Sequence, residues 1–243
     1  MSSEENPGEM TLWAHLHELR SCLIKSVIGI LITSIISYVF WRDIWKIISL
    51  PIPKDQVQLI NTAPVEAFIT SIKVAIISGI IFASPWVIYN VWNFIAPGLF
   101  KNEKKTLFPV LFFSMILFLA GASFCYFVVL PFGLSFLANY TLGEISANWR
   151  QGEYASFVLK VLIAFGASFE LPIISYVLTK LGVVNAKMLW SFARYAVIII
   201  FVMSALLTPP DPITQIMLAI PLIIIYALSI LVSYLVQKGK KES

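Results

Sequence analysis

Six long runs of apolar residues dominate this sequence, and a bilayer-spanning helix needs about 20 such residues. Only 12% of the 243 residues are charged, whereas a soluble domain carries about 25%. The runs are continuous, unlike the alternating segments of about ten residues that form a membrane β-barrel. We therefore predict an all-α polytopic membrane protein with one domain over residues 1–243. The expected spans are about 22–41, 66–91, 106–130, 154–179, 192–208 and 213–236.

The segments between these runs differ in length. Residues 10–23 form an amphipathic lead-in, with leucines at helical spacing, that we expect to lie along the membrane surface. The loops 42–65 and 131–153 are long, and the first is long enough to form a folded cap. Pro131 is expected to close the third span.

The fifth run is unusually short. Only thirteen uncharged residues separate Arg194 from Thr208, which gives roughly 20 Å of helix against a hydrocarbon core of about 30 Å. A turn rich in proline follows at once, with Asp211 at its tip. We expect a short fifth helix, a turn below the normal membrane surface and a locally thinned bilayer.

The placement of basic residues predicts the orientation. With six spans both termini share one side, where eleven lysines and arginines lie, against four on the opposite side. Lysine and arginine are enriched in cytoplasmic loops. We expect both termini in the cytoplasm and the two long loops in the periplasm.

Glu170 is an acid inside the fourth apolar run. A carboxylate near the centre of a membrane helix costs roughly 2.5–3.5 kcal/mol, and such residues are functional by default. Pro172 should kink the helix beside it, as Pro85 should bend the second span. Lys160 lies ten residues earlier, about 15 Å along the axis, and is a poor partner. Glu170 could serve partner docking, or it could carry protons in a solute transporter.

Two further acids, Glu18 and Glu103, lie on the predicted cytoplasmic side. Each could be an ordinary surface charge beside lysines or arginines. Alternatively, two carboxylates on one surface could each bind a guanidinium through charge-assisted hydrogen bonds.

Several functional classes have no support in the sequence. No nucleophile–base pair and no metal-ligand spacing occurs in the runs, and Cys22 and Cys125 read as small buried side chains. We therefore expect no enzymatic activity, no cofactor, no metal and no nucleic acid.

Six ordered motifs resemble the TatC family, the receptor subunit of the twin-arginine (Sec-independent) protein translocase. The resemblance covers about residues 15–236. The motifs are His15-Leu16-His17-Glu18-Leu19-Arg20; Ala83-Ser84-Pro85 with Tyr89, Trp92 and Phe94-Ile95-Ala96-Pro97; Leu99-Phe100-Lys101-Asn102-Glu103; Tyr126-Phe127-Val128-Val129-Leu130-Pro131; Ala164-Phe165-Gly166 followed by Ser168-Phe169-Glu170-Leu171-Pro172; and Thr208-Pro209-Pro210-Asp211 with Gln215 and Ala219-Ile220-Pro221.

The resemblance implies a curved, glove-like fold with short fifth and sixth helices, in the bacterial cytoplasmic (inner) membrane. It implies that the chain binds Arg-Arg signal peptides of folded precursors and nucleates TatA and TatB assembly for export driven by the protonmotive force. The residues that the family would use for the signal peptide are Glu18, Glu103, Arg20, Phe94, Leu99 and Lys101. Glu170 and Asp211 would meet partner single-span subunits, in an oligomeric complex surrounded by membrane lipid.

The alternative, a proton- or ion-coupled solute transporter that uses Glu170, leaves Glu18 and Glu103 without a function. It also requires more polar residues along a path than the third run offers.

Overall fold

Six helices in the described part of the chain are long and apolar enough to cross a membrane, which confirms the predicted six-span, all-α class. The structure, a computed structural model, describes residues 12–99, 104–139, 147–208 and 211–242. The helices and strands are α1 (Leu12–Val39), α2 (Trp41–Ile48), β1 (Val57–Ile60), α3 (Glu66–Leu99), α4 (Lys104–Phe124), the π-helix η1 (Cys125–Val129), α5 (Leu130–Asn139), β2 (Ala147–Arg150), α6 (Gln151–Ser168), α7 (Leu171–Lys180), α8 (Ala186–Leu207) and α9 (Pro212–Glu242).

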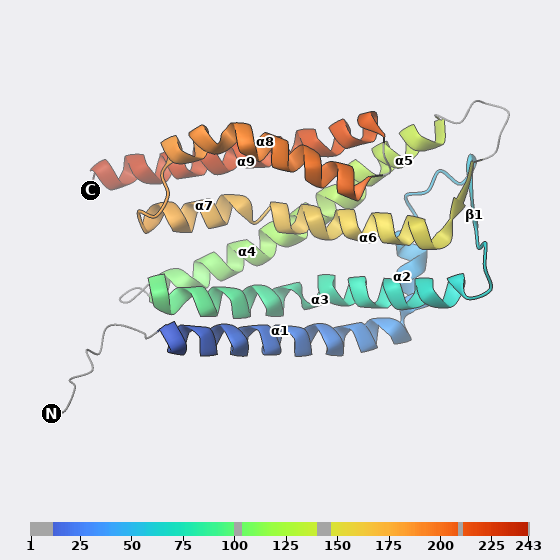
Figure 1. Cartoon of the computed structure of the whole chain (residues 1–243), viewed down its shortest axis with the longest axis horizontal. Coiled ribbons are helices and arrows are strands. Elements are labelled where there is room, and N and C mark those ends of the chain that lie inside the picture. The colour runs from blue at the N-terminus through green and yellow to red at the C-terminus, as the bar shows by residue number, and fades with distance from the viewer. Residues whose placement is uncertain (1–11, 100–103, 140–146, 209–210, 243) are drawn as a thin grey trace.

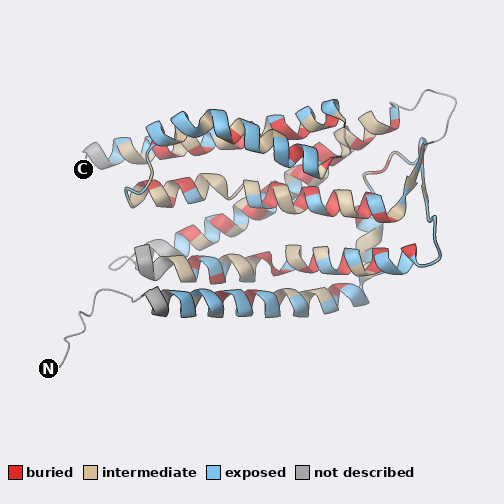
Figure 2. Cartoon of the chain, in the orientation of Figure 1, coloured by how far each residue is buried: buried red, intermediate tan, exposed pale blue. Residues whose placement is uncertain are grey.

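The long helices stand in a row that does not close on itself. Helix α1 packs on α3, α3 on α6, and α7 and α8 both pack on α9, while α4 crosses the row obliquely and contacts α3 and α6 (Figure 1). Helices α1 and α8 therefore form the two ends of the row. Both leave broad exposed faces (Figure 2), where apolar side chains such as Ile35 and Leu206 are available to lipid. Helix α1 begins and α9 ends at the same end of the molecule.

Small residues allow α1 and α3 to approach closely. A Cβ atom on Gly79 would lie 2.3 Å from the Ser34 hydroxyl, and one on Gly29 would lie 2.3 Å from the Trp86 ring. At this contact the Thr33 hydroxyl donates a 2.8 Å hydrogen bond to the Gly79 carbonyl. Backbone approach at small residues is a common way to pack membrane helices, since lipid provides no hydrophobic drive between them.

The third helical segment does not end at Pro131, so that prediction is wrong. Residues 125–129 form a π-turn in which the Leu130 N–H bonds the Cys125 carbonyl, and helix continues from there to Asn139. The widened π-turn relieves the clash that a proline ring makes with the preceding turn of an α-helix. The expected loop 131–153 consequently begins with a helix.

Several other expected bounds also change. Helix α1 runs without a break from Leu12 into the first span, and the position of the lead-in 10–23 along the membrane surface stays a prediction. The second span runs from Glu66 to Leu99, and the fourth begins at Gln151. The fifth span begins at Ala186, because the Asn185 side chain caps it by accepting a 2.8 Å hydrogen bond from the Met188 N–H.

The last two spans differ in helix length. Helix α8, with 22 residues, is the shortest of the six spans. Helix α9 has 31 residues and is not short, because its basic C-terminal end continues the helix past the apolar run.

The two long loops fold together at the end of the molecule opposite the start of α1. Strands β1 and β2 pair in parallel, with Val57 opposite Ala147 and Ile60 opposite Arg150. Beside them the buried carboxylate of Glu66 accepts hydrogen bonds from the Thr62 N–H (2.7 Å) and hydroxyl (2.8 Å). Its other oxygen faces the Gly152 N–H at 3.4 Å and the Arg150 side chain at 3.5 Å. The start of α3 is thereby tied to the start of α6.

Candidate functional site

Glu170 lies in a break of the fourth span. Helix α6 ends at Ser168, α7 begins at Leu171, and Pro172 is the second residue of α7. Proline has no N–H to bond the carbonyl four residues earlier, so the helical ladder is interrupted where the carboxylate sits. A proline in the first turn of α7 is tolerated, since N–H groups there lack helical partners anyway.

A chain of hydrogen bonds joins Glu170 to two other helices. The Ser114 hydroxyl on α4 donates to Oε2 of Glu170, and the Trp92 indole N–H on α3 donates to the Ser114 oxygen at 3.0 Å. Ser114 is fully buried, and Trp92 is nearly so. The other carboxylate oxygen, Oε1, is buried and accepts no hydrogen bond from the described residues. The carboxylate is therefore fixed on one side and unsatisfied on the other.

Glu170 also lines a cavity of about 220 Å³ between α3 and α7. The other lining residues are apolar or aromatic: Val87, Ile88, Val91, Trp92, Ile95, Ile174, Val177 and Leu178. A buried acceptor without a donor costs roughly 1–3 kcal/mol. A donor group brought into this cavity would recover part of that cost, so the arrangement is suited to docking a polar side chain in the membrane.

The predicted signal-peptide residues are only partly within the described chain. Glu18 and Arg20 lie near the start of α1, and Phe94 lies near the end of α3, which packs against α1. Glu18 is half-buried, and its Oε2 is buried without a hydrogen-bond partner among the described residues. Arg20 is exposed. Glu103 and Lys101 lie outside the described residues, as does the side chain of Leu99, so the pairing of Glu18 with Glu103 stays a prediction.

Asp211 has a local structural role. Its Oδ2 accepts a 2.9 Å hydrogen bond from the Thr214 N–H, and Oδ1 accepts a longer one from the Ile213 N–H. This is N-cap geometry, with Pro212 as the first helical residue of α9. The bond from the Thr214 backbone lowers the pKa of Asp211 below its usual value. Its proposed contact with partner subunits stays a prediction.

Two residues at the site were missed by reasoning from the sequence: Ser114 and Trp92. In the sequence, Trp92 looks like an aromatic residue at the end of a span, where tryptophan is common at the membrane interface. Ser114 is a lone hydroxyl within an otherwise apolar stretch of the third run. That isolation was the available signal, since a buried hydroxyl needs a partner.

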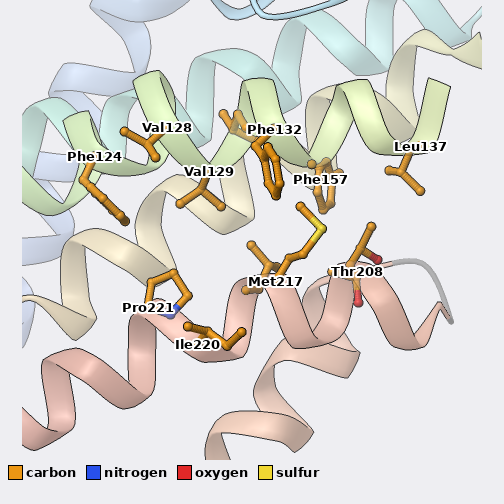
Figure 3. A pocket seen from close by; sticks show the side chains of 14 residues that line it. Phe124, Val128, Val129, Phe132, Leu137, Phe157, Thr208, Met217, Ile220 and Pro221 are labelled. Carbon is orange, nitrogen blue, oxygen red and sulfur yellow. The ribbon is translucent and has the colours of Figure 1, made fainter. Parts of the chain in front are cut away.

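A second cavity is almost entirely apolar. It measures about 260 Å³ and lies between α5, α6 and the start of α9 (Figure 3). Phe132, Phe157 and Met217 point into it, and Thr208 lies at its edge. Thr214 also lines it.

Known proteins with similar sequences share one description. The model of the family "Sec-independent protein translocase protein (TatC)" matches residues 14–221. A TatC protein of Aquifex aeolicus is 42% identical over 237 residues, covering 96% of this chain and 98% of that protein. One of Helicobacter pylori is 37% identical over 229 residues, covering 94% and 91%.

A solved structure supports the same assignment. A crystal structure of the twin arginine translocase receptor TatC superposes with a TM-score of 0.87 at 41% identity, covering 92% of this chain and 99% of that one. This family supplies a component of a protein translocase, not an enzyme. From the match over most of its length and the shared six-span fold, we conclude that this membrane protein belongs to the TatC family of Sec-independent protein translocase proteins.

Proposed function

We propose that this chain is the receptor core of a twin-arginine translocase. It would bind the Arg-Arg signal peptides of folded precursor proteins at its cytoplasmic face and nucleate assembly with TatA- and TatB-type subunits. Export would then be driven by the protonmotive force. The observation that carries the proposal is the half-buried carboxylate of Glu18, whose Oε2 has no hydrogen-bond partner among the described residues.

The chemistry of arginine fits such a carboxylate. A guanidinium is always charged and offers a planar fork of donors, so it can bond a carboxylate through two parallel hydrogen bonds. An ammonium group acts as a point charge without that fork. Glu18 and Glu103 would each take one arginine of the pair, with Arg20, Phe94, Leu99 and Lys101 shaping the surface around them.

Glu170 would act after recognition. Its Oε1 has no hydrogen-bond partner among the described residues, and Glu170 lines an apolar cavity between two spans, which suits a polar side chain carried into the membrane by a partner helix. Asp211, at the turn before α9, would stand beside a second helix of the same complex.

The proposed location is the bacterial inner membrane, with both termini in the cytoplasm. Helices α1 and α9 have their outer ends at the same end of the molecule (Figure 1), and most lysines and arginines gather on that side in the sequence.

Peptide retention tests the proposal. The whole chain, immobilised in detergent, is offered a twin-arginine signal peptide and the same peptide with twin lysine. We expect preferential retention of the arginine peptide. Glu18→Gln and Glu103→Gln should each weaken its binding by about 10- to 100-fold, the equivalent of one charge-assisted hydrogen bond.

The matched control is Asp55→Asn, which neutralises an exposed acid at the opposite end of the molecule and should bind like the wild type. Equal retention of the arginine and lysine peptides by the wild type would refute the receptor assignment.

A further inference from the structure

Two lysines, Lys73 and Lys160, lie inside membrane spans, and the function proposed above uses neither. Lys73 belongs to α3 and Lys160 to α6, and both are exposed. None of the salt bridges among the described residues includes either of them. A lysine within a membrane helix is costly unless it reaches water, a headgroup or an anion. Among the described residues, therefore, neither ammonium group has an anionic counterpart.

The two lysines lie at nearly the same depth. Helices α3 and α6 start together, because Oε1 of Glu66 meets the Gly152 N–H at 3.4 Å, and both run in the same direction (Figure 1). Lys73 comes seven residues after Glu66, and Lys160 eight residues after Gly152. At 1.5 Å per residue these positions are about 10 Å and 12 Å from that common start.

Lys160 faces away from α4, and Lys73 shares a face of α3 with a residue that lines the cavity at Glu170. On α6, Gly166 and Phe165 pack against Phe118 and Gly121 of α4, and Lys160 is about 120–140° from them around the helix. On α3, Lys73 is five full turns from Val91 and so shares its face. Val91 lines the cavity at Glu170.

Neighbouring helix axes lie about 8–10 Å apart, and α3 contacts α6 directly. Two flexible lysine side chains on one face can thus reach a single anion.

The turn between α8 and α9 lies near the same depth. Thr208 and Thr214, on either side of the turn, line the same cavity as Phe157 of α6 (Figure 3). Lys160 is less than one helical turn beyond Phe157. In Figure 1 the end of α8 and the start of α9 lie further into the molecule than the starts of α3 and α6. A bilayer thins beside a short apolar span, and only thirteen uncharged residues of α8 follow Arg194. The polar surface of the bilayer therefore approaches the level of the lysines there.

We propose that Lys73 and Lys160 together bind the phosphate group of a phospholipid, in the leaflet at the β-strand end of the molecule. Phosphate is the anion present at that surface, and each lysine near it contributes about 1 kcal/mol of attraction. The bound headgroup would hold the bilayer thinned along the face that leads to Glu170. The chain would thereby recruit lipid to its own groove.

Native mass spectrometry of the purified chain in detergent tests this site. The probes are phosphatidylglycerol, a diacylglycerol with the same acyl chains but no phosphate, and inorganic phosphate. We expect the wild type to retain phosphatidylglycerol in preference to diacylglycerol. The variant K73Q/K160Q should weaken that binding by about 30-fold, from the loss of two such contacts. K73R/K160R should preserve it, and K54Q, an exposed lysine outside the spans, serves as the matched control.

Each of the following outcomes would overturn the proposal. K73Q/K160Q could bind phosphatidylglycerol as the wild type does. Alternatively, it could lose the binding of diacylglycerol to the same extent as the binding of phosphatidylglycerol. Inorganic phosphate could displace the lipid completely at millimolar concentration, which would indicate an ion site. If the glutamine variant bound lipid normally but no longer co-purified with single-span subunits, the lysines would instead pair with an acidic side chain of a partner. A thermal melt of the same sample verifies that the glutamine variant is folded.

Discussion

At the residue scale, the membrane acid depends on Ser114 as much as on its own helix. The Ser114 hydroxyl accepts from Trp92 and donates to Glu170, so one small side chain satisfies two groups on different helices. Without the Ser114 hydroxyl, neither carboxylate oxygen of Glu170 would accept a hydrogen bond from the described residues. The geometry that holds the carboxylate toward its cavity is thus supplied by α4.

Replacing Ser114 by alanine should therefore destabilise the protein. The variant leaves the Trp92 N–H and a carboxylate oxygen unpaired, which costs about 1–3 kcal/mol for each buried polar group left unsatisfied. The measurement is the free energy of unfolding in detergent. Ser123→Ala, an exposed serine on the same helix, should change it little. Equal losses for the two variants would show that the hydrogen-bond chain contributes nothing.

Asp211 is the second residue whose role can be separated by substitution. Asparagine caps a helix about as well as aspartate, whereas alanine does not. At neutral pH we expect Asp211→Ala to lower the melting temperature and Asp211→Asn to leave it nearly unchanged.

The pH dependence follows from the lowered pKa of Asp211. Because the folded state favours the charged carboxylate, its contribution to stability is complete above the unfolded pKa of about 3.9 and is lost as the pH falls through the lower folded value. Below about pH 4 the melting temperature of the wild type should therefore fall relative to that of Asp211→Asn. A difference that does not vary with pH would contradict the capping role.

At the scale of helices, apolar run length predicted which segments are helices but not where they end. Helix ends are set by single polar contacts that run length does not show. Asn185 caps α8 before its apolar stretch begins, and the π-turn at residues 125–129 carries helix past Pro131. The break at Glu170 was predictable, because Pro172 removes a specific backbone donor.

The contact between α1 and α3 provides a prediction at this scale. A Cβ atom on Gly79 would lie 2.6 Å from the Cα and 2.7 Å from the backbone nitrogen of Ser34, and backbone atoms cannot move aside as a side chain can. Gly79→Ala should push the helices apart and cost about 1–3 kcal/mol, as overpacking does. Thermal unfolding in detergent measures it. Gly133→Ala, where no neighbouring atom lies within 4 Å, should not destabilise. A similar loss there would show that the loss at Gly79 does not come from the contact with Ser34.

At the scale of the whole molecule, charge placement and span number could be read from the sequence, but the meeting of distant segments could not. Glu170 stands out because it is an acid in an apolar run. Its partners are 56 and 78 residues away in the chain, and no local pattern links them. The same holds for Glu66 and Gly152, which join two loops that the sequence presents as separate.

The orientation of the whole molecule gives the last prediction. If both termini are cytoplasmic, a cysteine at Asp55 in the strand-bearing loops faces the periplasm, and one at Lys238 near the end of α9 faces the cytoplasm. Both positions are exposed, while the native Cys22 and Cys125 are buried and should react little. A membrane-impermeant maleimide, applied to cells with a permeabilised outer membrane, should label Asp55→Cys at once. It should label Lys238→Cys only after the inner membrane is disrupted. The reverse pattern would place the Glu18 surface outside the cell and rule out recognition of unexported precursors there.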